Sequence, residues 1–372
     1  MNLHLLWDEK IVKRIIKTFD TVFPDNNIYV IWKVSPYINK DIADRKDVLY
    51  IKDHNDTRLA KFDFSNIDKV IVHALENYKI DFIVSYVKKT VPIYWLLWGG
   101  EIYNGLLYHK GFPVYYKYSQ KRSIRSRIGH ILQRLGYITS YNRKFLKFIK
   151  QNDVSMLCCK EEYDIFCKYF PSYTKNLLNI DSFFYYPIDE ILNSDLLDKT
   201  AQGNVIMVGN SGSFTNNHEY VFKYLQKLDL RDKTIIAPLN YNGTPEYRNQ
   251  IHRKGLKLFG NRFYGLTEFL SLDDYNKLLL KAEVALFGNW RQEAVGNIVI
   301  ELYLGTKVFL SQKSPLLSHF RSLGITLFEL EKLNEKELHT PLPEDLKRKN
   351  KDILISMLNW DRLQKVTKDI FG

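Results

Sequence analysis

The sequence predicts an α/β protein of two doubly wound domains that face a cleft. The chain has 372 residues, whereas a single hydrophobic core rarely grows beyond about 250–300 residues. Short apolar runs alternate with helical patterns, which is typical of parallel strands joined by helices. The alternation stops in the polar segment 187–203 and then begins again, so we expect the boundary between two similar domains there.

In the first half, apolar runs indicate strands, and amphipathic stretches such as residues 8–22 indicate the helices between them. The expected strands are residues 3–6, 28–32, 48–51, 70–72, 83–86, 92–98, 154–158 and 183–186. This order predicts repeated βαβ units, and we assign residues 1–187 to the first domain.

The second half repeats the pattern, and we assign residues 188–342 to the second domain. The expected strands are residues 204–208, 234–239, 284–287 and 307–310, and the expected helices are residues 216–228, 245–258, 272–282 and 297–304. Residues 343–372 have apolar side chains at helical spacing. We expect them to form a C-terminal helix that packs back on the first domain.

The net charge of +12 is concentrated in one stretch, because residues 117–150 hold ten cationic side chains and no acidic one. Within it, residues 121–136 have the pattern of an amphipathic helix with a cationic rim of Arg122, Arg125, Arg127 and Arg134. Such a helix is suited to an anionic membrane surface. A solvated core helix is the plain alternative. A nucleic-acid partner has only the charge in its favour, since no zinc-finger or RNA-recognition signature accompanies it.

Cysteine spacing and hydropathy indicate a cytosolic protein without a spanning helix. Cys158, Cys159 and Cys167 form no CxxC pair, so neither a disulfide frame nor a structural zinc site is expected. The most apolar run, residues 91–98, is far shorter than the roughly 18 residues needed to cross a bilayer.

Two loops of the second half stand where an anion could bind, because each follows a buried strand and leads into a helix. The first loop contains Gly209, Asn210, Ser211, Gly212, Asn216 and Asn217. The second contains Arg291, Gln292, Gly296 and Asn297. Neither loop matches a dinucleotide or P-loop motif, so an ordinary turn with a polar cap remains the alternative for each.

Three further residues are candidates for ligand contacts or catalysis. Glu301, one turn into the helix after the second loop, could accept ribose hydroxyls, and Tyr241 could contribute to a base or sugar pocket. Glu101 follows a strand and two glycines, so it is the best candidate for a base that deprotonates a hydroxyl. His73, at the end of another strand, could assist it. Exposed glutamates, an Asn-Gly turn and a structural histidine are the alternatives.

Several spaced motifs together resemble glycosyltransferase family 56. They are Gly209-Asn210-Ser211-Gly212 with Asn216-Asn217-His218, Pro238 with Tyr241, Arg291-Gln292 with Gly296, and the preceding segment 98–103. The known activity of the family is transfer of 4-acetamido-4,6-dideoxygalactose from a dTDP-sugar to the lipid-linked disaccharide of enterobacterial common antigen. The likeness extends from about residue 73 to residue 330.

The resemblance implies a GT-B architecture of two Rossmann-like domains, with a nucleoside-diphosphate sugar bound by the second and a lipid-linked saccharide by the first. It also implies donor binding without a metal or other cofactor. This chain has Glu101 where the family has Asp, and Gly296-Asn297 where the family has Gly-Thr. A two-domain protein that binds a nucleotide or sugar without chemistry is the alternative reading.

Overall fold

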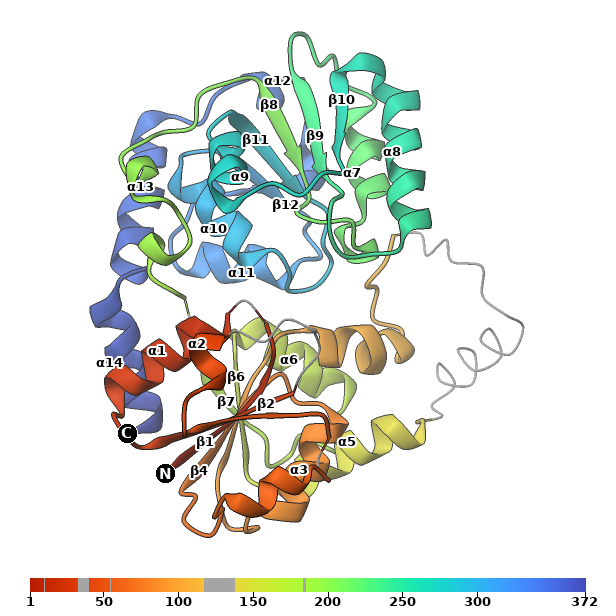
Figure 1. Ribbon diagram of the computed structural model, residues 1–372. Coiled ribbons are helices and arrows are strands. Elements are labelled where there is room, and N and C mark those ends of the chain that lie inside the picture. Colours follow the sequence, from red (N-terminus) through yellow and green to blue (C-terminus); the bar gives the residue numbers. More distant parts are fainter. Residues whose placement is uncertain (10, 33–39, 54, 117–137, 183–184) are drawn as a thin grey trace. The chain divides into compact units, whose positions relative to one another are not determined.

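The structure is a computed structural model that describes residues 1–372 except residues 10, 33–39, 54, 117–137 and 183–184 (Figure 1). Backbone contacts divide the chain into two compact units. Unit 1 contains Met1–Phe112, Arg122–Phe184 and Asp361–Gly372, and unit 2 contains Pro113–Lys121 and Tyr185–Trp360. Both units are therefore assembled from separate pieces of the chain.

Unit 1 is built on a seven-stranded parallel sheet with the order β3-β2-β1-β4-β5-β6-β7. Its strands are β1 (Asn2–Trp7), β2 (Asn27–Trp32), β3 (Val48–Ile51), β4 (Lys69–His73), β5 (Ile93–Leu96), β6 (Val154–Cys158) and β7 (Leu178–Asp181). Its helices include α1 (Val12–Val22), α2 (Lys40–Ala43), α3 (Asn77–Tyr86), α5 (Ser140–Gln151), α6 (Lys160–Tyr169) and α14 (Trp360–Phe371). The strand order reverses between β1 and β4, which is where open α/β sheets bind ligands.

The two faces of this sheet can be told apart on β5, because successive side chains of a strand point to opposite faces. Tyr94 contacts Phe371 of α14, with ring centroids 5.1 Å apart. Trp95 contacts Phe145 of α5 at 5.5 Å. One face of the sheet therefore packs against α14 and the other against α5.

The predicted tail, residues 343–372, is divided between the units. Helix α13 (Glu344–Met357) contacts α10 (Val295–Tyr303) of unit 2, and the buried Asn350 exchanges two hydrogen bonds with the backbone of Thr326, at 2.7 and 2.8 Å. Helix α14 packs on unit 1, where Phe371 is fully buried and its ring lies 5.2 Å from that of Phe19. Burial of such a ring contributes about 1.5–3 kcal/mol, so α14 is part of the core of unit 1.

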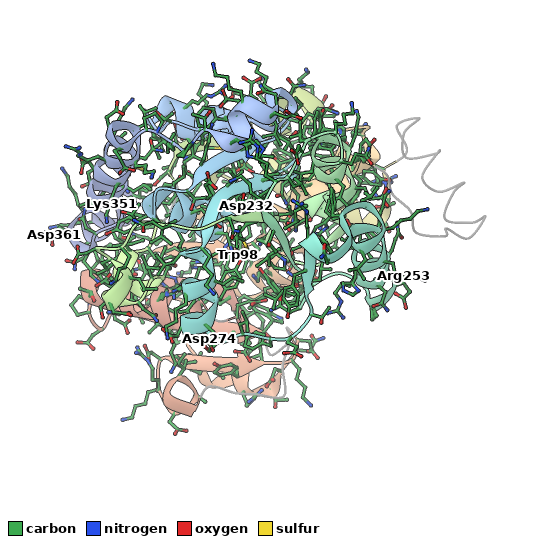
Figure 2. All side chains as sticks on the ribbon, turned by 90° about the horizontal axis from the view of Figure 1, so that it is seen from above. Trp98, Asp232, Arg253, Asp274, Lys351 and Asp361 are labelled. Atoms are coloured by element: carbon green, nitrogen blue, oxygen red, sulfur yellow. The ribbon has the colours of Figure 1, made fainter. Side chains whose placement is uncertain are left out.

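Unit 2 repeats the architecture with a six-stranded parallel sheet of order β10-β9-β8-β11-β12-β13. Its strands are β8 (Val205–Val208), β9 (Thr234–Pro238), β10 (Phe263–Leu266), β11 (Ala282–Phe287), β12 (Lys307–Leu310) and β13 (Phe328–Glu329). Besides α13, its helices include α7 (His218–Leu225), α8 (Pro245–Phe259), α9 (Leu272–Leu279), α10 (Val295–Tyr303), α11 (Pro315–Ser322) and α12 (Glu335–His339). Exposed charges such as Arg253 on α8 and Asp274 on α9 lie on its outer surface (Figure 2).

The prediction of a strand at residues 83–86 is wrong, because these residues form the last turn of α3. The segment holds only Ile83, Val84 and Tyr86 around the polar Ser85, and four residues are too few to distinguish the strand period from the helix period. The strand expected at 183–186 is also displaced: β7 ends at Asp181, and residues 183–184 lie outside the described part of the chain. The predicted amphipathic helix 121–136, with Arg122, Arg125, Arg127 and Arg134, lies outside it too. Among the residues described, no helix has the length and apolar character to cross a bilayer.

Candidate active site

The two predicted loops of unit 2 lie together at the carboxyl edge of its sheet. Strands β8 and β11 are neighbours and parallel, so the loops that follow them start from the same edge. The Asn217 amide donates to the Gly288 carbonyl at 3.0 Å, and the Asn289 amide donates to the Thr215 carbonyl at 3.2 Å. The loops are thus joined directly, at the point where the strand order of this sheet reverses.

Asn216 fixes the shape of the first loop. Its Oδ1 accepts a hydrogen bond from the Asn210 backbone N–H at 2.9 Å, and its Nδ2 donates to Ser211 Oγ at 3.0 Å. Gly209 has φ 68°, and a Cβ there would lie 2.5 Å from Asn216 Oδ1. Only glycine therefore fits at position 209, and the buried Asn216 side chain is used to hold the loop.

Asn217 connects the first loop to a segment that the sequence did not single out. Its Oδ1 accepts from the Tyr116 backbone N–H at 2.9 Å, and its Nδ2 also donates to the Val114 carbonyl at 3.2 Å. The Tyr116 ring lies 5.0 Å from that of Tyr220 and 6.2 Å from that of Trp290. No local pattern reveals this contact, because Tyr116 and Asn217 are 101 residues apart.

Tyr241, on the loop after β9, lies against the first loop. Its hydroxyl accepts from the Asn210 amide at 3.2 Å, and its carbonyl accepts from the Gly212 N–H at 2.9 Å. The side chain is 42% exposed. A partly exposed aromatic ring held by its hydroxyl can stack on a base or sugar.

Arg291 is held on the second loop by Glu293. Its Nε donates to Glu293 Oε2 at 3.3 Å, and the same oxygen accepts from the Asn289 amide at 2.9 Å. No sequence pattern singled out Glu293. Gln292 is half-buried beside them. Glu293 engages Nε, whereas Nη1 of Arg291 is buried without a partner among the described residues and could donate to a ligand.

Helix α10 begins directly after this loop, behind Ala294, which has φ 65°. No atom lies within 4 Å of where a Gly296 Cβ would stand, so the first turn faces open space. The Asn297 amide donates to the Tyr275 hydroxyl at 2.6 Å. Backbone N–H groups of a first turn carry partial positive charge and favour an anion such as a diphosphate.

Glu301 is 1% exposed, one turn further along α10. Burial raises its pKa to about 8, so the carboxyl group is mostly protonated at neutral pH. This burial contradicts the alternative of an exposed residue. A neutral carboxyl group can both donate and accept a hydrogen bond.

Buried polar atoms without a protein partner gather around these three loops. Within the described residues they include Asn210 Oδ1, His218 Nε2, Asn240 Oδ1, Asn289 Oδ1, Trp290 Nε1, Arg291 Nη1 and Glu301 Oε2. Buried polar groups are normally hydrogen-bonded, and each exception calls for an explanation. Their concentration at one sheet edge indicates a polar ligand site.

In unit 1, Glu101 lies at the end of β5, on the face that packs against α5. Its Oε1 accepts from the Trp98 backbone N–H at 3.0 Å and from the Trp95 indole at 3.1 Å. The positive φ of Gly99, 90°, lets the chain turn back so that the two donors reach one oxygen. Burial raises the pKa of Glu101, and these donors and Lys79 partly offset the rise. A π-helical turn, Ile102–Leu107, follows at once; such turns are frequent at functional sites.

Two charged residues near Glu101, Lys79 and Glu76, were not among the residues predicted from the sequence. Lys79 on α3 is fully buried, and its Nζ donates to the carbonyls of His73 and Ala74. Burial lowers its pKa to about 7. Glu76 accepts from the Trp7 indole and the Tyr78 hydroxyl, both at 2.5 Å. Both residues come shortly after the end of β4 in the sequence. This closeness to a strand end is the signal from which they could have been predicted as site residues.

His73 lies on the opposite face of the sheet from Glu101. In the register of β4 and β5, Val72 pairs with Trp95, so His73 points the other way. Its ring is buried 5.9 Å from that of His4 and 6.4 Å from that of Phe19 on α1. Burial lowers its pKa well below the usual value. The described contacts of the His73 side chain are those of a neutral core residue, and none joins it to Glu101.

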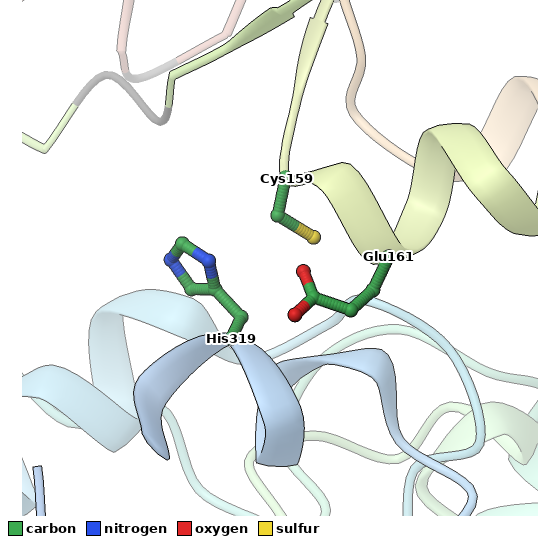
Figure 3. Close-up of side chains that lie close together, drawn as sticks. All are labelled: Cys159, Glu161 and His319. Atoms are coloured by element: carbon green, nitrogen blue, oxygen red, sulfur yellow. The ribbon is translucent and has the colours of Figure 1, made fainter. Parts of the chain in front are cut away.

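Cys158 and Cys159 are buried in unit 1. Figure 3 labels Cys159 and Glu161 at the start of α6, and His319 on α11. Burial raises the pKa of the Cys158 and Cys159 thiols, which keeps them protonated. His319 of unit 2 is paired with the Tyr185 hydroxyl at 2.7 Å. In the described parts of the chain, neither unit by itself gathers three metal-ligating side chains.

The fold is shared with solved glycosyltransferases and related enzymes. HepE of Anabaena, solved with UDP and glucose, superposes with a TM-score of 0.62 at 12% identity, over 99% of this chain and 98% of that chain. WaaG, a glycosyltransferase of lipopolysaccharide biosynthesis, gives 0.56 at 12% identity over the whole of both chains. Sucrose-phosphate synthase of Thermosynechococcus elongatus gives 0.63 at 9% identity, over 100% of this chain and 98% of that chain. Two Rossmann-like units of this kind confirm the predicted GT-B fold.

The sequence itself matches one family model over most of its length. Residues 68–353 match the 4-alpha-L-fucosyltransferase family, glycosyl transferase group 56. This range includes Glu101 and all three loops of unit 2, and it begins just before β4. The chain therefore belongs to glycosyltransferase family 56.

Proposed function

We propose that this glycosyltransferase moves a deoxy or deoxyamino sugar from a dTDP-sugar to a saccharide on polyprenyl diphosphate, in the synthesis of a bacterial surface polysaccharide. The observation that carries the proposal is the cluster of unpartnered buried polar atoms where the two loops of unit 2 are joined. Membership of the family supports the lipid-linked acceptor and the donor sugar class.

On the donor side, the first turn of α10 and Arg291 would hold the diphosphate. As the sugar leaves, negative charge develops on this group, and a fixed guanidinium and helix end stabilise that charge without rearrangement. Tyr241 and Glu301 would contact the nucleoside. The solved complex of HepE with UDP supports a nucleotide on a fold of this kind.

On the acceptor side, Glu101 would remove the proton from the attacking hydroxyl. Its raised pKa makes it a stronger base than an exposed glutamate, and the Trp98 and Trp95 donors fix its orientation. No metal step is needed for this division of roles.

The proposal is tested with a panel of nucleoside diphosphates and their sugars in a thermal-shift assay, followed by transfer of a labelled sugar to a lipid-linked acceptor. Selective stabilisation by dTDP-sugars reports binding to the folded state. Binding without transfer or hydrolysis would instead favour the non-catalytic binding protein.

Replacing Arg291 by Ala is expected to weaken dTDP binding about 10- to 100-fold, since a charge-assisted hydrogen bond contributes about 1.5–3 kcal/mol. Isothermal titration calorimetry measures the change. Arg253→Ala is the matched control, because Arg253 is exposed on α8 (Figure 2). Equal affinities of the Arg291 variant and the wild type would remove Arg291 from the donor site.

Peripheral attachment to an anionic membrane is the last part of the proposal. Changing Arg122, Arg125 and Arg127 to Gln removes three positive charges, each worth about 1 kcal/mol near an anionic surface. Co-sedimentation with phosphatidylglycerol liposomes is therefore expected to fall strongly. Undiminished sedimentation would locate the attachment elsewhere.

A further inference from the structure

A groove with an apolar floor lies between α3 and α5 of unit 1 and takes no part in the roles assigned above. Its volume is about 620 Å³, within the range of about 300–1,000 Å³ that is usual for small-molecule sites. Its apolar lining consists of Ile80, Ile83, Val84, Val87, Val91 and Phe148, together with Ile93 at the start of β5. Val84 is 71% exposed, whereas Ile80, Ile83, Ile93 and Phe148 are at most 5% exposed.

The rim of the groove is cationic. Among its described lining residues, five are basic (Lys88, Lys89, Arg143, Lys144 and Lys147), and one, Asp81, is acidic. Asp81 is already paired with Lys144, so the other cations dominate the local field. An apolar floor under a cationic rim complements a molecule with an apolar chain and an anionic head.

One end of the groove lies at the same edge of the sheet as the candidate base. Both helices begin at the carboxyl edge of the sheet, where the Asn77 amide of α3 donates to the Tyr141 carbonyl of α5 at 2.9 Å. Ile80 and Ser140, which line this end of the groove, lie within one helical turn of that bond. Glu101 is at the same edge and, through Trp95, on the same face of the sheet.

We propose that this groove binds the prenyl chain and diphosphate of the lipid-linked acceptor, with the chain along the apolar floor and the diphosphate at Arg143 and Lys147. The inference rests on the proposed function, because it names the acceptor part that unit 1 recognises. A flat bilayer surface needs exposed cations but no concave apolar floor. The groove therefore favours a single amphiphile over a membrane patch.

The test is binding of geranylgeranyl diphosphate to the full chain, measured by calorimetry. Val84→Glu places a carboxylate in the groove and is expected to weaken binding about tenfold or more. The apolar contact of a valine-sized group with the prenyl chain is lost, and the new negative charge repels the diphosphate. Leu178→Glu is the matched control, because Leu178 is also an exposed apolar residue of unit 1, 63% accessible. Equal affinities of the two variants would overturn the proposal.

A second pair of variants tests the rim. Arg143→Gln with Lys147→Gln is expected to weaken geranylgeranyl diphosphate about tenfold, and Lys168→Gln with Lys175→Gln, two exposed cations elsewhere on unit 1, to have little effect. If inorganic pyrophosphate binds as tightly as geranylgeranyl diphosphate, the floor contributes nothing and the proposal is wrong. If the variant with Arg143→Gln and Lys147→Gln loses binding to phosphatidylglycerol vesicles but binds geranylgeranyl diphosphate as the wild type does, the proposal is also wrong. The rim would then be a membrane-binding surface and not an acceptor site.

These measurements are independent of catalysis. Retained prenyl binding with no sugar transfer would reject the proposed function and leave the groove as a prenyl site. Transfer to a lipid-linked acceptor that is unaffected by Val84→Glu, together with unchanged prenyl affinity, would reject the groove and leave the proposed function in place.

Discussion

Replacing Glu101 by Gln is expected to lower kcat by about 10²–10⁴-fold, the range that a positioned general base contributes. The amide oxygen of Gln can still accept from the Trp98 N–H and the Trp95 indole, so the geometry of the turn is retained while the proton acceptor is lost. Affinity for dTDP should stay nearly unchanged, because the proposed nucleotide contacts all lie in unit 2. Steady-state transfer of labelled sugar at saturating substrate gives the first quantity, and calorimetry gives the second.

The pH dependence provides an internal check on Glu101. A base acts only when deprotonated, so the rate of the wild type should rise with pH through the pKa of Glu101, which burial raises above its usual value. Glu344→Gln, at a carboxylate 76% exposed on α13, should leave both rate and profile unchanged. A Glu101→Gln enzyme that turns over at the wild-type rate would show that another group takes the proton.

Glu301→Gln is expected to make the protein more stable than the wild type at pH 9 while leaving the two nearly equal at pH 5. The pKa of Glu301 is raised from 4.5 to about 8 in the folded state. Folding therefore favours the protonated form of Glu301. Its contribution to the free energy of unfolding is fully present below pH 4.5 and is lost as the pH rises through 8. The difference between variant and wild type should grow by about 3–5 kcal/mol across this window.

Thermal unfolding midpoints of the two proteins at pH 5 and pH 9 measure this change. Glutamine is neutral at both values and close to glutamate in shape, so packing of α10 is preserved. Glu344→Gln again serves as a control whose midpoint should follow that of the wild type. Parallel midpoints of Glu301→Gln and wild type would show that Glu301 is not held neutral in the fold.

The sequence predicted those parts of the site that follow directly from a strand end. The loops at Gly209 and Gly288 are of this kind, because parallel strands deliver their carboxyl ends to one edge whatever the details of packing. His73 shows the limit of that rule. Its place at the edge was predictable, but the face it points to depends on the register between β4 and β5, which no local pattern contains.

Residues that act through distant partners were not predictable. Tyr116 and Val114 meet Asn217 across about a hundred positions of the chain. Lys79 is unusual because a lysine in a helix of this kind is normally solvated. Here its Nζ donates hydrogen bonds to two backbone carbonyls at the end of β4. Short apolar runs such as residues 83–86 fail for a different reason, because four residues do not distinguish the two periods.

The interleaving of the two units has a consequence for biosynthesis and for expression of fragments. Residues 361–372 leave the ribosome after all of unit 2. Until then the N-terminal sheet lacks α14, so Phe19 and Tyr94 are without their contacts to Phe371. A truncated gene for residues 185–360 alone would likewise lack Val114 and Tyr116, stripping Asn217 of two hydrogen bonds and baring the Tyr220 and Trp290 rings. Neither half can be cut out as one uninterrupted stretch of coding sequence and keep its full core.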